Sequence, residues 1–319
     1  METQKEVRSL RQRVGIMVAG DPATVVTTLI GLEEMGVDRA WVPFGPIWNP
    51  DVLTTLAAVA ARTSHLKFGT NIVQVTSRHP TLMAQQILSI DSLAPGRLTL
   101  GIGTGSAITA KSTYGTEIKA PLTYLREYIQ ILRPLLQQGE VHHQEPPFIT
   151  DVKLAAAAQT PIYISALGPA AFRLAGEIAD GALPFLCPIP YLLNTAIPAL
   201  SEGAATARRP RPPVVAHFPV AITKDRTAAL QAARKLLGFY TTLPTYRNMF
   251  TAAGFSEQEI STTSDTLMES LVVSGDEHQI KDRLQEVLSS EIDSVAINIV
   301  PISDVAQEGT RLARLVSNL

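Results

Sequence analysis

Short apolar stretches alternate along this chain with longer stretches in which apolar residues recur at helical spacing. The first kind predicts buried strands and the second amphipathic helices, so their repeated pairing is typical of βα units. We expect strands at residues 13–19, 38–42, 66–73, 97–102, 161–166, 181–184, 213–222 and 294–300. We expect a helix after each strand, at residues 22–35, 50–62, 80–93, 121–138, 169–179, 190–207, 226–240 and 304–316. Eight such pairs predict an α/β fold of the (β/α)8, or TIM, barrel type.

The barrel is expected to form one domain over residues 1–319, because no Gly/Ser-rich linker or run of charge divides the chain. Residues 1–12 have mixed charge and are expected to be a flexible N-terminus. Residues 139–160 and 241–274 are longer than a βα loop needs. Loops of that length are usually functional or contain extra helices, so insertions are expected there.

The composition of the chain argues against several classes of protein. The chain has 27 basic and 29 acidic residues, a net charge of −2, which argues against a nucleic-acid partner or a polybasic membrane surface. Charged residues make up only 18%, below the usual quarter, so the chain must bury much surface in a core or a subunit interface. One cysteine, Cys187, argues against a disulfide framework.

No membrane or secretory segment is expected. Residues 1–13 lack an apolar core of the signal-peptide kind. Residues 181–201 have the length of a membrane span but contain four prolines, which prevent a regular spanning helix. The expected location is therefore the cytoplasm.

A barrel carries its active site at the carboxyl ends of its strands, so catalytic and binding residues are expected in the loops there. The first candidate is residues 69–80, G-T-N-I-V-Q-V-T-S-R-H-P. Its polar side chains are Asn71, Gln74, Thr76, Ser77, Arg78 and His79. They predict either a polar rim for a planar ring or a phosphate, or ordinary loop polarity with helix capping.

Two further segments follow strands. Residues 97–106, R-L-T-L-G-I-G-T-G-S, have a G-x-G-x-G that lets backbone N–H groups approach a ring or an anion. The alternative is a flexible loop at the mouth of the barrel. This is no Rossmann fingerprint, because G-x-G-x-x-G is absent and no helix is expected directly behind it. Residues 163–173, Y-I-S-A-L-G-P-A-A-F-R, put Ser165 beside a helix start at Gly168 and Pro169, which predicts either an anion site or a plain N-cap.

Other catalytic signatures are missing from the sequence. It contains no G-x-S-x-G elbow, no P-loop lysine motif and no H-E-x-x-H. His142 and His143 are adjacent and would face opposite ways on a strand, so no metal site is expected.

Taken together and in order, these segments resemble the bacterial luciferase-like superfamily of flavin- or deazaflavin-dependent oxidoreductases. The resemblance rests on residues 69–80, on M-A-Q-Q-I-L-S-I-D-S-L-A-P-G-R-L-T-L-G-I-G-T-G-S (83–106), and on P-L-T-Y-L-R-E-Y-I-Q-I-L-R-P-L-L (121–136). It continues in P-I-Y-I-S-A-L-G-P-A-A-F-R-L-A-G-E-I-A-D-G (161–181) and S-G-D-E-H-Q-I-K-D-R-L (274–284). It covers the chain from about residue 13 to the C-terminus.

The resemblance implies a cofactor site. Members of the superfamily usually hold a non-prolyl cis peptide against the central ring of the cofactor, here at Asn71–Ile72, with Gln74 close by. Thr104, Gly105 and Ser106 would border the ring or its side chain. Leu167, Gly168 and Pro169 would line the cofactor phosphate, with Ser165 and Ala166 beside them. The superfamily also implies a homodimer.

The form of these motifs looks most like the branch that uses coenzyme F420, often described as methylenetetrahydromethanopterin reductase-like. It implies an oxidoreductase that moves a hydride between F420 and a small to medium organic substrate. One alternative is an FMN-dependent monooxygenase that takes reduced flavin from a separate flavin reductase and activates oxygen. The other is a non-catalytic flavin-binding protein.

One stretch departs from the branch. Some F420 enzymes have an acidic residue and a histidine after strand two, where this chain reads W-V-P-F-G-P-I-W (41–48). A mechanism that uses that histidine is therefore in doubt. Phe44, Pro46 and Trp48 would instead form an apolar wall, although Trp41 and Trp48 could also be core. The remaining candidates for the general acid or base are His79, Arg78 and Glu117.

Overall fold

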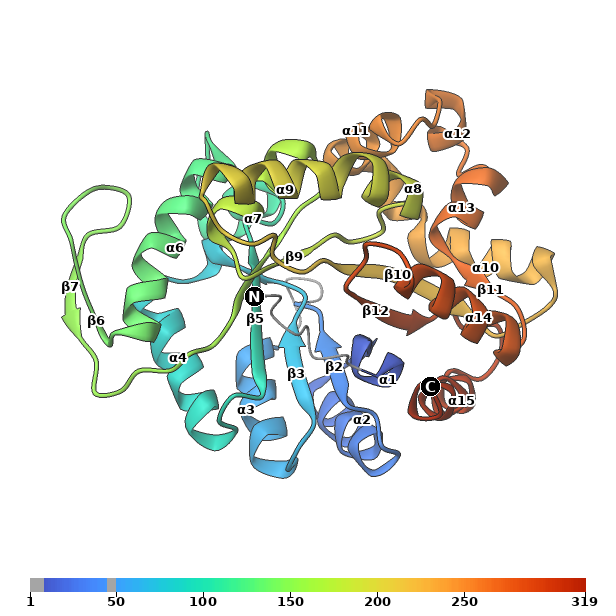
Figure 1. Ribbon diagram of the computed structural model, residues 1–319, viewed down its shortest axis with the longest axis horizontal. Coiled ribbons are helices and arrows are strands. Elements are labelled where there is room, and N and C mark those ends of the chain that lie inside the picture. The colour runs from blue at the N-terminus through green and yellow to red at the C-terminus, as the bar shows by residue number, and fades with distance from the viewer. Residues whose placement is uncertain (1–8, 45–49) are drawn as a thin grey trace, which may run out of the picture.

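A parallel sheet runs through the middle of the protein and helices surround it (Figure 1). The structure is a computed structural model and describes residues 9–44 and 50–319. The strands of the sheet are β1 (Val14–Met17), β2 (Arg39–Val42), β3 (Lys67–Thr70), β4 (Val73–Gln74), β5 (Leu98–Gly103), β8 (Ile162–Ser165), β9 (Gly181–Leu183), β10 (Val215–Ala221), β11 (Val273–Ser274) and β12 (Ser294–Ile299). Each of the eight predicted strands coincides with one of these, so the strand predictions are confirmed.

The sheet order is that of an α/β fold whose parallel sheet curls on itself. Among the described residues the order is β11-β10-β12-β1-β2-β3-β5-β8-β9, with β4 paired to β5. The edge strand β9 approaches β10 at one parallel bridge, Ala182–Val214, where the Ala182 N–H donates to the Pro213 carbonyl at 2.9 Å. The two arms of the curled sheet therefore meet near the start of β10.

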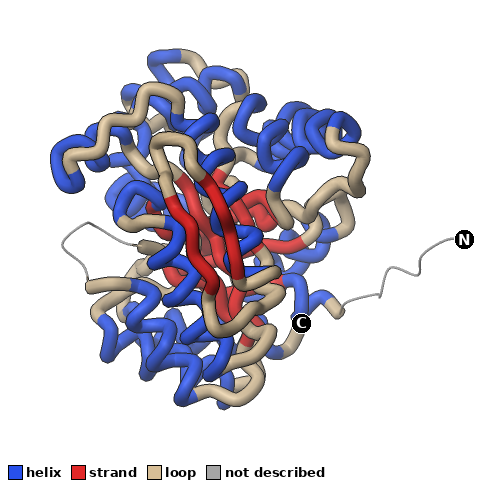
Figure 2. The backbone as a smooth tube through the Cα atoms, turned by 90° about the vertical axis from the view of Figure 1, so that its left-hand side faces the viewer, coloured by secondary structure: helices blue, strands red, loops and turns tan. Residues whose placement is uncertain are grey.

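The predicted helices cover the outside of the sheet, as the turned view also shows (Figure 2). They are α2 (Pro22–Glu34), α3 (Val52–Arg62), α4 (Pro80–Leu93), α6 (Pro121–Gln137), α7 (Pro169–Ile178), α9 (Ile197–Thr206), α10 (Arg226–Leu237) and α15 (Val305–Ser317). Before α9 come a short helix, α8 (Ile189–Tyr191), and a π turn (Leu192–Ala196). Helices α2, α3, α10 and α15 begin after an aspartate whose carboxylate accepts hydrogen bonds from first-turn N–H groups.

Several elements were not predicted. Helix α5 (Ala107–Tyr114) begins directly after Ser106, so the expectation of no helix behind the G-x-G-x-G was wrong. Its short sequence, A-I-T-A-K-S-T-Y, has no clear apolar stripe from which to infer it. Helix α1 (Leu10–Arg13) and a 3-10 turn, η1 (Val75–Ser77), were missed for the same reason.

Both long segments contain their own structure. Residues 139–160 hold an antiparallel hairpin, β6 (Glu140–His143) and β7 (Thr150–Lys153), which extends from the edge of the molecule in Figure 1. Residues 241–274 contain α11 (Pro244–Ala252), α12 (Glu257–Ser261) and α13 (Asp265–Leu271), after a 3-10 turn, η3 (Gly238–Thr242). Helix α14 (Glu277–Leu288) leads from this insertion back to β12.

A small apolar cluster fills the inside of the curled sheet. It contains the buried residues Trp41, Leu183, Val215 and Ala296, against which Met17, Ile72 and Tyr163 pack. A Cβ on Gly15 or Gly69, on the strands beside β2, would lie 2.8 or 2.6 Å from the Trp41 ring. The two glycines therefore make room for the indole, and Trp41, 1% exposed, is core. No helix within residues 9–44 and 50–319 has the length and apolar character needed to cross a membrane.

Candidate functional site

The inward-facing positions of the strands form two layers, because side chains alternate between the faces of a sheet. Four strands supply a second inward position, two residues beyond the first and towards the carboxyl end, and the residue two beyond the end of β9 occupies the corresponding place. These positions are Gly103, Ser165, Phe185, His217 and Asn298, after Gly101, Tyr163, Leu183, Val215 and Ala296. We call these five residues and Ile72 the mouth layer. Parallel strands in this fold class bind ligands at their carboxyl ends, so the mouth layer is the candidate site.

Contacts tie part of the mouth layer to the predicted cofactor segments. A Cβ on Gly103 would lie 2.2 Å from the Ser165 Oγ and 3.2 Å from the Ile72 Cδ1. The bare backbone of Gly103 thus separates the end of β8 from the residue between β3 and β4. The peptide bond between Asn71 and Ile72 is cis, which confirms that prediction.

Two amides beside Ile72 have unsatisfied polar atoms. The Asn71 Nδ2, a donor, and the Gln74 Oε1, an acceptor, are buried and have no hydrogen-bond partner among the described residues. Buried polar atoms are nearly always paired, so each such atom calls for an explanation. A planar ligand with both acceptors and a donor along its edge would satisfy both.

The loop after β5 lies against Gln74. Gly105 has a φ of 67°, in the left-handed region, and a Cβ there would lie 2.5 Å from the Gln74 Cδ. A larger residue at this position would therefore displace Gln74. Thr104 is half-buried, and Ser106 is the N-cap of α5 with no side-chain capping bond. The structure thus brings Gln74 against Gly105, which Thr104 and Ser106 flank in the chain.

The loop after β8 is the third predicted segment. Ser165 ends β8, Ala166 is buried, and the Tyr191 hydroxyl donates to the Leu167 carbonyl at 2.8 Å. Gly168 is the N-cap of α7 without a side-chain bond, and Pro169 is its first residue. The α7 start is therefore adjacent in the chain to Ser165, whose hydroxyl lies at Gly103.

Arg78 is held in an ion-pair network. Its guanidinium donates to the Asp51 carboxylate at 2.6 Å and to the Gln86 Oε1 at 2.9 Å. Burial raises the pKa of Asp51, but hydrogen bonds from the Thr54 N–H and from Arg78 lower it by more, and the net shift is downward. Asp51 is also the N-cap of α3, so Arg78 fastens η1 to that helix.

The other two candidates for the acid or base lie on the surface. The His79 Nδ1 accepts from the Thr81 N–H at 3.2 Å and caps α4, and its ring contacts the edge of Phe148. Partial burial lowers the pKa of His79. Glu117 is exposed and lies 3.5 Å from the Lys111 ammonium. The structure does not bring these residues into the mouth layer.

Sequence reasoning missed His217 and Asn298. The His217 Nε2 lies 2.8 Å from the Asn298 Oδ1, and the ring stacks on Phe185 with centroids 4.0 Å apart. His217 is 2% exposed, and burial lowers its pKa to about 4, although the Asn298 hydrogen bond acts in the opposite direction. The usable signal was a histidine and an asparagine at inward positions of two otherwise apolar strands.

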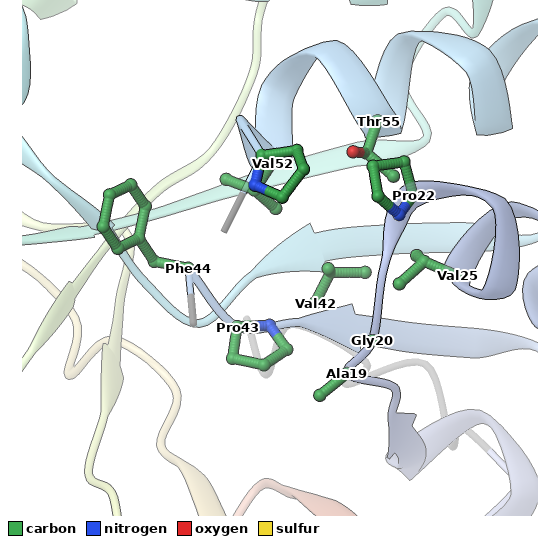
Figure 3. A pocket seen from close by; sticks show the side chains of 10 residues that line it. Ala19, Gly20, Pro22, Val25, Val42, Pro43, Phe44, Val52 and Thr55 are labelled. Carbon is green, nitrogen blue, oxygen red and sulfur yellow. The ribbon is translucent and has the colours of Figure 1, made fainter. Parts of the chain in front are cut away.

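A small apolar hollow lies outside the mouth layer (Figure 3). Its lining is Ala19, Gly20, Pro22, Val25, Val42, Pro43, Phe44, Pro50, Val52 and Thr55, from the loops after β1 and β2 and the helices behind them. Phe44 borders it, whereas Pro46 and Trp48, the other residues of the predicted aromatic wall, lie outside the described residues. The hollow contains none of the mouth-layer residues.

Known proteins resemble this chain in sequence or in fold. An F420-dependent glucose-6-phosphate dehydrogenase of Nakamurella multipartita is 32% identical over 233 residues, 67% of this chain and 68% of that protein. A 5,10-methylenetetrahydromethanopterin reductase of Methanolobus tindarius is 32% identical over 228 residues, 70% of this chain and 69% of the relative. The solved structure of a coenzyme F420 dependent tetrahydromethanopterin reductase from Methanopyrus kandleri matches in fold, with a TM-score of 0.79 and 23% identity over 96% of this chain and 97% of that one.

The family-level match covers nearly the whole described chain. The family model for luciferase-like monooxygenases matches residues 8–294, which include every strand of the curled sheet up to the start of β12 and all of the mouth layer except Asn298. The chain belongs to the luciferase-like monooxygenase family.

Proposed function

We propose that the protein is an oxidoreductase that binds coenzyme F420 and transfers a hydride between it and a small to medium organic substrate. The relatives named above support F420, since one is described as F420-dependent and is 32% identical. The structural observation that carries the proposal is the pair of buried, unpartnered amide atoms, Asn71 Nδ2 and Gln74 Oε1. A deazaflavin or flavin ring presents carbonyl acceptors and a ring N–H along one edge, so the pair fits that class of cofactor.

Each part of the site has a role in this proposal. Ile72 and the bare backbone of Gly103 form an apolar seat for the ring, and Asn71 and Gln74 hydrogen-bond its edge. Ser165 and the start of α7 hold the cofactor phosphate through backbone N–H groups at a helix N-terminus. When bound, the cofactor supplies a site that accepts or gives up a hydride, and the protein supplies orientation and exclusion of water.

We extend the proposal to the assembly. The single bridge between β9 and β10 supports closure of the sheet into a (β/α)8 barrel within one domain. A homodimer is proposed from the family resemblance, and light scattering would measure it directly. A flavin reductase would be a partner only if the cofactor were FMN.

Titration of the purified protein with F420 and with FMN, followed by fluorescence, tests the cofactor. We expect micromolar binding of F420 and weaker binding of FMN. Gly103→Ala should weaken F420 binding about tenfold, because the added methyl group enters the seat between Ser165 and Ile72. Gly31→Ala is the matched control, since a Cβ there meets nothing within 4 Å, and it should leave the affinity unchanged.

Two outcomes would contradict the proposal. Micromolar FMN binding without F420 binding would favour the oxygen-activating FMN monooxygenase instead. Binding of either cofactor with no reduction or reoxidation by any substrate would favour a non-catalytic flavin-binding protein.

A further inference from the structure

His217 lies across the mouth layer from the proposed cofactor seat. From β3 the strand order runs through β5, β8 and β9, and the bridge leads to β10. Four steps in a cycle of eight strands put β3 and β10 on opposite walls. A ring held on Ile72 would therefore leave the His217 side of the mouth layer for the substrate.

The hydrogen bonds fix which nitrogen of His217 is free to accept. The Asn298 Nδ2 donates to the Ile299 carbonyl at 3.2 Å, which leaves the Asn298 Oδ1 as the atom facing the His217 Nε2. An amide oxygen only accepts, so the proton is on Nε2 and the lone pair is on Nδ1. The Nδ1 is buried and has no hydrogen-bond partner among the described residues.

A series of aromatic contacts leads from the His217 imidazole towards the insertion. Phe185 stacks on the imidazole at an interplanar angle of 13°, and Tyr240 packs on Phe185 with centroids 5.4 Å apart. Tyr246, from the insertion, packs on Tyr240 at 5.0 Å. A single hydrogen-bond acceptor in an apolar, aromatic wall suits an apolar molecule with one donor group.

We propose that His217 determines substrate specificity, accepting at Nδ1 a hydrogen bond from the hydroxyl group of an apolar alcohol. This inference rests on the proposed function, because the cofactor seat defines the substrate side. Asn298 is the positioning residue that fixes the imidazole, and Phe185 holds the ring plane. Since Nδ1 is buried, the side chains around it shift when the alcohol enters.

The test compares alcohols with the matching ketones, which lack the donor. Cyclohexanol and cyclohexanone, and 1-phenylethanol and acetophenone, are titrated calorimetrically into the F420-loaded protein. We expect each alcohol to bind at least about tenfold more tightly than its ketone, because a ketone leaves the Nδ1 lone pair facing another acceptor. The 15N resonance of the His217 Nδ1 should also shift when the alcohol binds.

Two variants separate recognition from packing. His217→Phe keeps the stack on Phe185 and removes the acceptor, so the alcohol-to-ketone ratio should fall to about one. His217→Asn places an amide oxygen near the Nδ1 position and should restore part of the ratio. Ser165→Ala, on the cofactor side, should weaken F420 binding and leave the ratio unchanged.

The outcomes distinguish the two proposals. If the wild-type protein does not bind F420, the proposed function is contradicted. This binding is measured before any alcohol is added. With F420 bound, a wild-type ratio near one, no binding of either alcohol, or an unmoved Nδ1 resonance overturns the role of His217. An unchanged ratio in His217→Phe overturns it as well, and the wild-type readouts decide if that variant does not fold.

Discussion

Replacing Gly203 with alanine is expected to lower the free energy of unfolding by about 3 kcal/mol, because two helices touch there through their backbones. A Cβ on Gly203 of α9 would lie 2.0 Å from the Arg173 carbonyl oxygen of α7, and one on Gly176 of α7 would lie 2.1 Å from the Leu200 carbonyl oxygen. Backbone atoms cannot rotate away as a side chain can, so the helices must separate.

Gly309→Ala is the matched control for that substitution. Gly309 is also inside a helix, α15, but a Cβ there meets nothing within 4 Å. Alanine should therefore stabilise the protein by about 0.5–1 kcal/mol through helix propensity alone. Urea denaturation at constant m-value measures both changes, and a similar, small effect at the two positions would contradict the close approach of α7 and α9.

The same crossing connects stability to the candidate site. Helix α7 starts at Pro169, directly after the residues proposed to hold the cofactor phosphate. Displacement of α7 by Gly203→Ala should therefore weaken F420 binding as well, whereas Gly309→Ala should not.

The fold was largely predictable because its signal is repeated and local. Each of the eight predicted strands contains a short apolar run, and the helix after it has an apolar face and often a start signal such as Asp21 or Pro80. The hairpin β6–β7 was missed because both its strands alternate between half-buried and exposed residues and have no apolar run. The hairpin is attached to the rest of the protein by Phe148, which lies between its strands and packs on Tyr124 and Tyr128 of α6.

The site was predictable only in part. The cofactor segments are contiguous in sequence, so the resemblance to a family could identify Asn71–Ile72 and the loop after β5. The interaction of His217 with Asn298 joins residues 81 positions apart, and no local pattern reveals it. Arg78 shows the reverse case: a polar residue in a promising motif pairs with Asp51, 27 positions away, to fasten a helix.

Acidification from pH 7 to pH 4 is expected to destabilise the wild type by about 3 kcal/mol more than it destabilises His217→Phe. The imidazole is buried and neutral, with a pKa of about 4, whereas an unfolded chain has a histidine pKa of about 6.5. Between these two values the unfolded state binds a proton that the folded state does not, so stability falls as the pH falls. Well above pH 6.5 both states are neutral, and this contribution is absent.

The comparison with the variant is needed because other groups also lose stabilisation in acid. Asp51 and Glu33 have pKa values below their usual ones in the folded protein, so their contributions are present above the unfolded pKa and disappear as the carboxylates are protonated. These losses are common to both proteins and cancel in the difference. Urea denaturation at pH 7, 6, 5 and 4 gives that difference, whatever the variant's stability at pH 7. Parallel curves for the two proteins would mean that burial does not hold the folded-state pKa of His217 below its ordinary value.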